Sequence, residues 1–507
     1  TAAGLARVLT ERAAAGPSPT APAGGHRPRV LIGHDARHRS DVFATDIARV
    51  LAGAGIEAHL VAGPVPTPVV AFGVVHRGVD AGVVVTASHN PRDDNGVKVY
   101  ADDGAQIIPP LDAEIAAAMD AVGLVADADL APPDHELVVP VGADLLDAYV
   151  AHTARLVPAG APRALRVAYT PVHGVGGRVL AEVFAAAGFD PPAVVAEQAR
   201  PDPDFPGMPF PNPEEPGVLD AVLSLGAEVS ADLVVANDPD ADRLAVAVPD
   251  PAGGFRVLTG DEAGCLLAEH RLAAGSGPDR LVVNSIVSSR RLARIAEHHG
   301  VHHARTLTGF KWIVRPALAH PEWRFVLGYE EALGYAVADV PRDKDGIAAA
   351  VAVAQMVAEG LADGWSLLDL LDTLDRRHGV HLTGQRSVRF EGDDADAVMA
   401  GAVADLRRDP PAAVAGVTVR TVTDLGAGTG DLPPADVLVY ELEQGRHLVV
   451  RPSGTEPKLK IYGEVVVPVT DTPAEARERA RGMLDELLDG ADALVAERAA
   501  RSGGATP

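Results

Sequence analysis

Three aspartates alternate along a short loop, Asn237-Asp-Pro-Asp-Ala-Asp-Arg243, that follows an apolar run ending at Ala236. Carboxylates this close repel one another unless a cation neutralises them, and hard oxygen ligands favour Mg²⁺ or Ca²⁺. The spacing also opens an EF-hand loop, but Arg243 stands where that loop needs Gly and Pro249 stands where it needs Glu. A solvated acidic turn is the alternative. The preceding strand and Arg243 favour a metal site, whose ligands are Asp238, Asp240 and Asp242.

A serine follows a second apolar run, in the loop Thr86-Ala-Ser-His-Asn-Pro91. The hydroxyl of Ser88 can act as a nucleophile or carry a phosphoryl group if a neighbour activates it, whereas a lone serine more often forms a turn or cap. A Ser-His-Asp hydrolase fits poorly, because His89 adjoins Ser88 and no G-x-S-x-G elbow surrounds it. Lys98 would move protons if burial or nearby positive charge lowers its pKa; the alternative is a solvated surface lysine.

The loop Arg451-Pro-Ser-Gly-Thr-Glu-Pro-Lys458 has the groups of an anion site. Arg451 supplies a fork of donors, Ser453 and Thr455 supply hydroxyls, and Gly454 lets backbone N–H groups come close to an anion. A plain turn between two strands is the alternative. The residue types of this loop favour a phosphate-binding loop.

The apolar runs alternate with helical stripes, a pattern typical of βαβ units and a mostly parallel sheet. The pattern recurs three times, and each time the second run leads into a polar loop. The third such loop is Gly328-Tyr-Glu-Glu-Ala-Leu-Gly334. Open parallel sheets bind ligands beyond the carboxyl ends of their strands, so the three loops are predicted to converge on one cleft. The paired runs are 29–33 with 82–86, 165–169 with 232–236, and 280–284 with 324–328.

We therefore predict an α/β fold class: three similar mixed α/β domains in tandem, followed by a smaller α+β domain, around a central cleft. The predicted α/β domains are 1–146 with the serine loop, 147–254 with the metal loop, and 255–376 with the Glu-Glu loop. The last domain, 377–507, combines strands with two helical stripes, 394–406 and 473–488, and has the phosphate loop.

The composition excludes several classes of protein. The chain has 507 residues, with 44 Lys and Arg against 70 Asp and Glu, a net charge of −26. Such a charge repels phosphates and argues against nucleic acid or an anionic membrane as a partner. No apolar run approaches the roughly 18–20 residues of a membrane span. The single cysteine, Cys265, excludes an intrachain disulfide and indicates a cytoplasmic location.

Taken together and in this order, the four loops resemble the α-D-phosphohexomutase superfamily, the phosphoglucomutases and phosphomannomutases. Its members have a serine loop of the T-A-S-H-N-P type, a D-P-D-x-D-R metal loop, a Glu-bearing sugar loop and an R-P-S-G-T-E-P phosphate loop. The resemblance runs through nearly the whole chain. It implies three related α/β domains and a fourth, smaller domain, in agreement with the division above. Other similar stretches are 33–37, 103–108, 169–174, 211–215, 308–312 and 344–346.

The resemblance implies a phosphosugar mutase, an intramolecular phosphotransferase that interconverts hexose 1-phosphate and hexose 6-phosphate. Ser88 would be a phosphoserine, and Lys98 would act as acid and base. Mg²⁺ would be held by the three aspartates and by a phosphate oxygen at Ser88. The reaction would pass through a bound sugar bisphosphate, and glucose 1,6-bisphosphate would be the activator. The partners would be small sugar phosphates, and the protein would be a monomer or a small homo-oligomer.

The resemblance also assigns the residues that bind substrate. The phosphate that is not reacting would be held by Arg451, Ser453, Gly454 and Thr455. Glu330 and Glu331 would accept hydrogen bonds from sugar hydroxyls. Positive charge for the phosphates would come from Arg243, Lys311 and Lys344. Supporting residues would be Arg37, which would also offset phosphate charge, His89 and Asn90.

Two departures from the family bear on activity and specificity. The early Gly-rich loop, of the G-T-A-G-L-R-G type, is absent, so we expect the first domain to lack its N-terminal part. The sugar loop reads Glu-Glu-Ala-Leu-Gly-Tyr rather than G-E-x-S-G-H, so Ala332 lacks a hydroxyl that would help to read the sugar. Phosphoglucomutase is the first expectation, with phosphomannomutase or phosphopentomutase as alternatives. A non-catalytic sugar-phosphate-binding paralogue and a metal-dependent phosphatase are alternatives of other classes.

Overall fold

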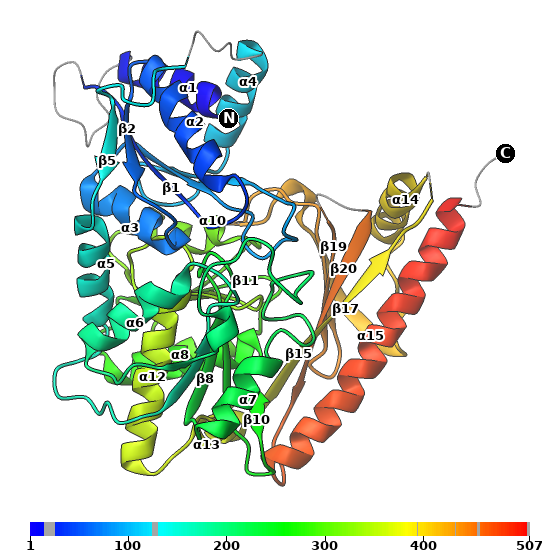
Figure 1. The fold of residues 1–507 in the computed structure, drawn as a ribbon. Coiled ribbons are helices and arrows are strands. Elements are labelled where there is room, and N and C mark those ends of the chain that lie inside the picture. The colour runs from blue at the N-terminus through cyan, green and yellow to red at the C-terminus, as the bar shows by residue number, and fades with distance from the viewer. Residues whose placement is uncertain (15–25, 124–129, 393, 431, 454–456, 504–507) are drawn as a thin grey trace. The chain divides into compact units, whose positions relative to one another are not determined.

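The structure is a computed structural model that describes residues 1–14, 26–123, 130–392, 394–430, 432–453 and 457–503. The chain forms two compact units. Unit 1 comprises residues 1–275 and 314–366, and unit 2 comprises residues 276–313 and 367–507. Each unit is described separately, with the element labels of Figure 1.

The first sheet of unit 1 has five strands. In pairing order they are β4 (Val97–Ala101), β3 (Ala81–Val85), β1 (Arg29–His34), β2 (Glu57–Val61) and β5 (Val138–Val141). β1 runs parallel to β2 and β3, β2 runs parallel to β5, and β4 returns antiparallel beside β3. β3 is buried along its whole length, and strands buried on both faces read as continuous apolar runs.

Helices cover both faces of this sheet (Figure 1). Leu5, Ala44 and Ile115 from three helices pack with Val30 and Ile32 of β1 in one core. Those helices are α1 (Ala2–Ala14), α2 (Ser40–Gly53) and α4 (Leu111–Val122), and two others are α3 (Thr67–Arg77) and α5 (Asp144–Ala154).

The second sheet of unit 1 repeats this plan. Its order is β10 (Phe255–Val257), β9 (Leu244–Pro249), β8 (Leu233–Asn237), β6 (Val167–Thr170) and β7 (Ala193–Val194). The parallel pair β6–β8 corresponds to β1–β3, and β9 returns antiparallel beside β8 as β4 does beside β3. The serine loop and the aspartate loop thus occupy equivalent places, each between a central strand and its antiparallel return. The helices of this part are α6 (Gly176–Ala187) and α7 (Asp220–Glu228).

The rest of unit 1 contains the hairpin β13 (Arg324–Glu330) and β14 (Gly334–Ala336), with α8 (Gly260–Ala274), α11 (Arg315–Ala319) and α12 (Gly346–Asp363). By length and composition α12 is able to cross a membrane, but 78% of this stretch is buried inside the structure. The Asp345 side chain caps α12 by accepting hydrogen bonds from the N–H groups of Ile347 and Ala348. The burial identifies α12 as a core helix.

Unit 2 combines a parallel strand pair with an antiparallel sheet. β11 (Arg280–Ser285) runs parallel to β12 (His302–Thr306). The antiparallel sheet has the order β15 (Val380–Arg389), β20 (Lys458–Val467), β19 (His447–Pro452), β18 (Leu438–Leu442), β17 (Val417–Asp424) and β16 (Ala413–Val414). The helices are α9 (Arg291–His299), α10 (Phe310–Ile313), α13 (Leu367–His378), α14 (Ala395–Arg408) and α15 (Pro473–Gly503).

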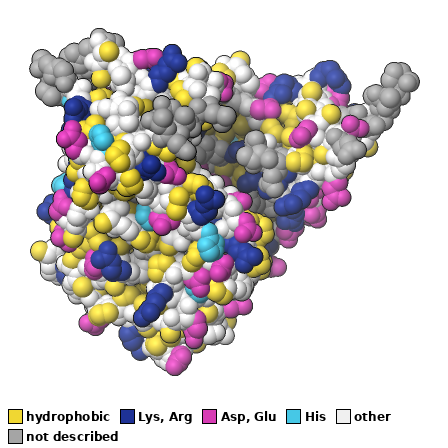
Figure 2. Space-filling view, turned by 45° about the horizontal axis from the view of Figure 1, so that its top comes forward, with side chains coloured by type: hydrophobic (Ala, Val, Ile, Leu, Met, Phe, Trp, Pro, Cys, Tyr) yellow, Lys and Arg dark blue, Asp and Glu magenta, His cyan; other side chains and the backbone are white. Residues whose placement is uncertain are grey.

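The predicted fold class is confirmed: mixed α/β parts precede an α+β part. One element is longer than predicted, because α15 runs to Gly503 although its stripe was placed at 473–488. The buried positions Ala491 and Val495 continue the helical spacing beyond the predicted end. On the face that Figure 2 shows, acidic and basic side chains are interspersed.

Candidate active site

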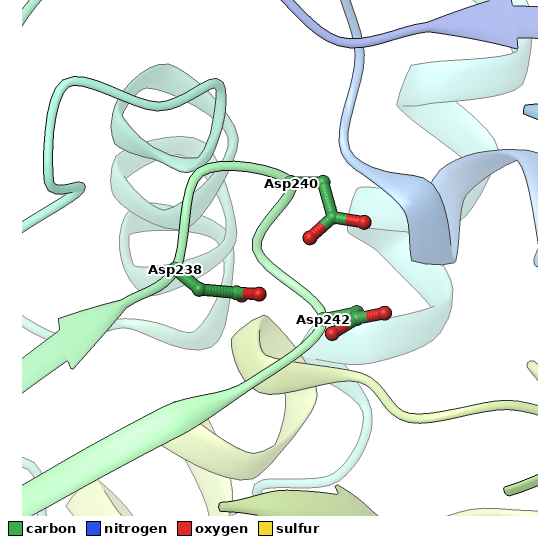
Figure 3. A group of neighbouring side chains, drawn as sticks. All are labelled: Asp238, Asp240 and Asp242. Atoms are coloured by element: carbon green, nitrogen blue, oxygen red, sulfur yellow. The ribbon is translucent and has the colours of Figure 1, made fainter. Parts of the chain in front are cut away.

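The three aspartates lie on the loop that joins β8 to β9, with their carboxylates on the same side of the loop (Figure 3). All three are fully buried, and one oxygen from each lies within 4.8 Å of the others. Two hydrogen bonds between side chains and the backbone hold the loop: the Asn237 Nδ2 donates to the Arg243 carbonyl at 2.6 Å, and the Arg243 N–H donates to Asp238 Oδ1 at 3.0 Å. Ala241 takes a left-handed conformation with φ 56°, so a tight turn brings alternate side chains together.

The chemistry of this triad fits a hard divalent cation. Asp240 Oδ1 and Asp242 Oδ1 are buried and accept no hydrogen bond from the part of the chain that the structure describes. Buried carboxylate oxygens without partners are costly. Burial and the charges of Asp240 and Asp242 raise the pKa of Asp238 well above its ordinary value. A bound Mg²⁺ would satisfy the free oxygens and relieve the repulsion.

Ser88 lies in hydrogen-bonding contact with this triad. Its Oγ donates to Asp238 Oδ2 at 2.8 Å. The loop leaves β3 through Thr86, whose Oγ1 accepts the Ser88 N–H at 2.8 Å, and Ser88 has a left-handed backbone with φ 50°. A non-glycine residue in this region is strained and is held there by its surroundings. The sequence prediction that the serine and aspartate loops approach each other agrees with this contact.

Arg37 provides part of that support. It is 3% exposed, and its two terminal nitrogens donate to the carbonyl oxygens of Ser88 at 2.7 Å, Asn90 at 2.6 Å and Pro91 at 2.7 Å. The Asp35 carboxylate lies 3.3 Å from its Nε. The guanidinium is therefore occupied by the backbone of the serine loop.

Two lysines contact the triad. Lys98 Nζ lies 2.8 Å from Asp240 Oδ2 and 2.5 Å from Asp242 Oδ2. Lys344 Nζ lies 3.2 Å from Asp242 Oδ2 and 3.4 Å from Asp343 Oδ1. These ammonium groups neutralise much of the acidic charge.

The pKa of Lys98 is raised, whereas the sequence analysis required a lowered pKa for this lysine to act as a base. Burial lowers the pKa of Lys98, but the charges of Asp240, Asp242 and Asp343 outweigh burial and raise it above its ordinary value. A cation bound to the triad would weaken this attraction, because it would compete for the same oxygens.

Arg243 lies among carboxylates next to the Glu-Glu loop. Its Nη1 is 3.6 Å from Glu214 Oε2. Burial lowers the pKa of Arg243, but nearby carboxylates, Glu330 among them, raise it overall. The Leu244 N–H donates to the Leu333 carbonyl at 3.0 Å, which fixes the start of β9 beside the turn of the β13–β14 hairpin.

The Glu-Glu loop is packed tightly against α8. Glu330 and Glu331 are half-buried. A Cβ placed on Gly260, the first residue of α8, would lie 1.9 Å from the Glu331 carbonyl oxygen. Only glycine permits this close approach.

The two residues after Ser88 differ in their surroundings. His89 is half-buried, and burial followed by the charge of Arg243 lowers its pKa to about 3, so the ring is neutral at pH 7. Asn90 is exposed, and its Nδ2 donates to Asp94 Oδ2 at 3.2 Å.

The remaining predicted residues belong to unit 2. Arg451 donates through Nη1 to Thr308 Oγ1, and the Ser453 N–H donates to the Lys458 carbonyl at 2.8 Å. Arg451 and Ser453 line a pocket of about 680 Å³ whose other walls are mainly apolar. Lys311 is half-buried, with its ammonium 5.8 Å from the Trp312 ring centroid. Gly454 and Thr455 lie outside the described residues.

Several residues of the site were missed by the sequence analysis. Thr67 Oγ1 donates to Asp240 Oδ2 at 2.6 Å. Tyr100 and Gln106 each donate to Asp343 Oδ2 at 2.7 Å. The position of Asp343 directly before Lys344 was an available signal, whereas nothing near Thr67 in the sequence indicates its contact with a loop 173 residues away.

Comparisons with known proteins identify the family to which the chain belongs. The chain matches the models of phosphoglucomutase/phosphomannomutase α/β/α domains I, II and III over residues 7–125, 147–253 and 259–375. It also matches the model of the C-terminal domain over residues 399–478.

Individual relatives cover most of the chain. A protein of Haemophilus influenzae named "Probable phosphomannomutase" is 41% identical, covering 90% of this chain and 92% of its own. A phosphoglucomutase of Staphylococcus epidermidis is 32% identical, covering 86% of this chain and 82% of its own. The solved structure of a phosphoglucomutase/phosphomannomutase family protein from Burkholderia thailandensis shares the fold, with a TM-score of 0.69, 21% identity and coverage of 98% and 93%. The chain belongs to the phosphoglucomutase/phosphomannomutase family of the α-D-phosphohexomutases and is a phosphomutase, an isomerase that acts by intramolecular phosphoryl transfer.

Proposed function

We propose that this phosphomutase interconverts hexose 1-phosphate and hexose 6-phosphate, with glucose phosphates as the preferred substrates. The reaction proceeds through a phosphoserine at Ser88 and a bound hexose bisphosphate. The observation that supports this most directly is the 2.8 Å contact between Ser88 Oγ and Asp238 Oδ2. That contact places the Ser88 hydroxyl beside three buried carboxylates, where a phosphoryl group and its counter-ion would meet.

In the first half-reaction the bond between phosphorus and Ser88 Oγ breaks, while a bond forms between phosphorus and the free hydroxyl oxygen of the sugar monophosphate. The sugar hydroxyl loses its proton to a base and the departing Ser88 Oγ gains one, so the product is a bisphosphate and a serine with a free hydroxyl. The bisphosphate then reverses its orientation in the site. In the second half-reaction the bond between phosphorus and the other sugar oxygen breaks and a bond to Ser88 Oγ forms, while Ser88 Oγ loses its proton and the departing sugar oxygen gains one.

Lys98 is the proposed acid and base. Its ammonium contacts Asp240 and Asp242, the two members of the triad other than Asp238, which contacts Ser88. A protonated Lys98 serves as an acid toward a leaving oxygen, and it serves as a base only when its attraction to the aspartates is reduced. When bound, Mg²⁺ supplies that reduction and neutralises charge on the transferring group. Asp238, Asp240 and Asp242 would hold the ion.

The rest of the substrate is bound by charge and hydrogen bonding. Glu330 and Glu331 would accept hydrogen bonds from sugar hydroxyls, and Arg243 and Lys344 would offset phosphate charge. In unit 2, Arg451 and Ser453, with Lys311, Gly454 and Thr455, would bind a phosphate. Glucose 1,6-bisphosphate would prime the enzyme by phosphorylating Ser88.

The four-domain division with boundaries after residues 146, 254 and 376 remains part of this proposal. So do a cytoplasmic location and a monomeric or small homo-oligomeric state. Gel filtration with light scattering would test the oligomeric state.

Mannose phosphates are the second candidate, favoured by the name of the Haemophilus influenzae relative. The two sugars differ by one epimeric hydroxyl, and such discrimination rests on few contacts. The test is the kcat/KM of the Mg²⁺-loaded protein for glucose 1-phosphate, mannose 1-phosphate and ribose 1-phosphate, each with its matching bisphosphate. The proposal is supported if kcat/KM is highest for glucose 1-phosphate. If it is highest for mannose 1-phosphate or ribose 1-phosphate, the proposed substrate is wrong and the proposed type of reaction stands.

Inorganic phosphate measured in the same reactions separates a mutase from a phosphatase. The proposal expects hexose 6-phosphate to form without a matching release of phosphate. Stoichiometric phosphate release, or binding without interconversion, would contradict it.

A further inference from the structure

We propose that Thr67 is a positioning residue for the metal site: its hydroxyl holds one oxygen of Asp240 so that the other oxygen faces the cation. The inference rests on the proposed metal site. It concerns a residue of the first α/β part that acts on a ligand in the second.

Thr67 donates two hydrogen bonds to Asp240. Its Oγ1 donates to Asp240 Oδ2 at 2.6 Å, and its backbone N–H donates to the Asp240 carbonyl oxygen at 3.0 Å. Both side chains are fully buried. One residue therefore fixes both the backbone and the carboxylate plane of Asp240.

The contacts divide the two oxygens of Asp240 into different roles. Oδ2 accepts one hydrogen bond from the Thr67 hydroxyl and another from Lys98 Nζ, which lies 2.8 Å away. Oδ1 is buried and accepts no hydrogen bond among the described residues. Two donors on one oxygen resist rotation of the carboxylate, which leaves Oδ1 as the ligand atom.

The start of α3 makes this contact possible. The Val65 N–H donates to the His34 carbonyl at 2.9 Å, and Pro66 is extended, with φ −58° and ψ 141°, immediately before Thr67 opens the helix. The first N–H groups of a helix have no partner within it. The N–H of Thr67 is therefore available to Asp240, and the hydroxyl beside it is held in a fixed place.

Donors that orient a metal ligand commonly affect affinity as strongly as some ligands do, because the ligand otherwise samples unproductive orientations. Loss of such a partner typically weakens metal binding about 10–100-fold. We expect a loss of this size for Thr67→Val, which keeps the shape of the side chain and removes the donor. Thr67→Ser keeps the donor and should bind metal nearly as the wild type does.

The test is a titration of the metal-free, dephosphorylated protein with Mn²⁺, in which free Mn²⁺ is followed by electron paramagnetic resonance and Mg²⁺ is added as competitor. The matched control is Thr153→Val, because Thr153 is equally buried but lies on α5. Thermal unfolding of each metal-free variant reports stability separately. If Thr67→Val does not fold, Thr67→Ala and Thr67→Ser form a second pair that differs only in the hydroxyl.

A weakened affinity in the variants without the hydroxyl, with Thr67→Ser and Thr153→Val near the wild type, supports the proposal. Wild-type affinity in Thr67→Val overturns it. So does an equal loss in Thr67→Ser and Thr67→Ala, or in Thr153→Val. Absence of Mn²⁺ binding by the wild type would overturn the metal site itself, and with it this inference.

Discussion

At the scale of single residues, the acidic triad is balanced by the chain's own cations. Lys98 contacts Asp240 and Asp242, and Lys344 contacts Asp242. Removing one partner of a buried ion pair is far more costly than the pair is worth, because a charge is left without compensation. A metal ion bound to the triad would therefore neutralise the same carboxylates as the lysines do.

Lys98→Met tests this overlap. In the metal-free protein the change should lower the free energy of unfolding by about 3–5 kcal/mol, since two buried carboxylates lose their partner. Saturating Mg²⁺ should restore more stability to the variant than it adds to the wild type. The measurement is the unfolding midpoint in urea with and without Mg²⁺. An equal destabilisation in both conditions would contradict the shared role.

At the scale of elements, the site depends on loops that are fixed at both ends. The serine loop follows β3 and the aspartate loop follows β8, at equivalent positions in their sheets. β3 pairs with the antiparallel strand β4, and β8 pairs with the antiparallel strand β9. Within the serine loop, Arg37 holds the carbonyls of Ser88, Asn90 and Pro91. A buried guanidinium thus holds the backbone of the loop that carries the Ser88 hydroxyl.

Arg37→Lys tests that placement. A single ammonium does not reproduce the planar fork that reaches three carbonyls. We expect faster hydrogen exchange in peptides covering residues 87–95 and a fall in kcat of about tenfold to a hundredfold, the size of effect that small misplacement of a reacting group produces. Arg92→Lys is the control, because Arg92 is on the same loop with its side chain 57% exposed. Equal effects in both variants would contradict a specific role for Arg37.

The cap of α12 predicts a pH dependence. Burial raises the pKa of Asp345 from 3.8 to about 6. Between these values the folded state binds a proton that the unfolded state has lost, so stability falls as pH rises from about 4 to about 6 and then levels off. The difference amounts to about 3 kcal/mol.

Asp345→Asn should remove this fall and keep the cap, since Asn is also a good N-cap residue. The measurement is the urea unfolding midpoint of wild type and variant from pH 4 to pH 8. A difference between the two proteins that is constant over this range would rule out titration of Asp345 as the cause.

At the scale of the whole molecule, the sequence was sufficient for the fold class, and it singled out the loops to which we assign the chemistry. Apolar runs such as β3 and β8 are continuous because both faces of the strand are buried, and the alternating aspartates stand directly after one of them. Those signals are local. The end of α15 was missed because its last turns bury small side chains such as Ala491, which stand out weakly from the polar positions around them.

What the sequence did not predict depends on contacts between distant segments. Thr67 meets Asp240 across 173 residues, and Arg37 meets the carbonyls of a loop about fifty residues away. The raised pKa of Lys98 follows from three carboxylates that only the fold gathers around it. Hydrogen bonds to backbone oxygens and electrostatic neighbours leave no periodic pattern in a sequence.

The measurement that tests the central claim most directly is the intact mass of the protein after incubation with glucose 1,6-bisphosphate. The account predicts a species about 80 Da heavier, mapped to Ser88 by fragmentation, lost again on addition of glucose 1-phosphate and absent from Ser88→Ala. A phosphoryl group on another residue, or a Ser88→Ala variant that retains turnover, would contradict it.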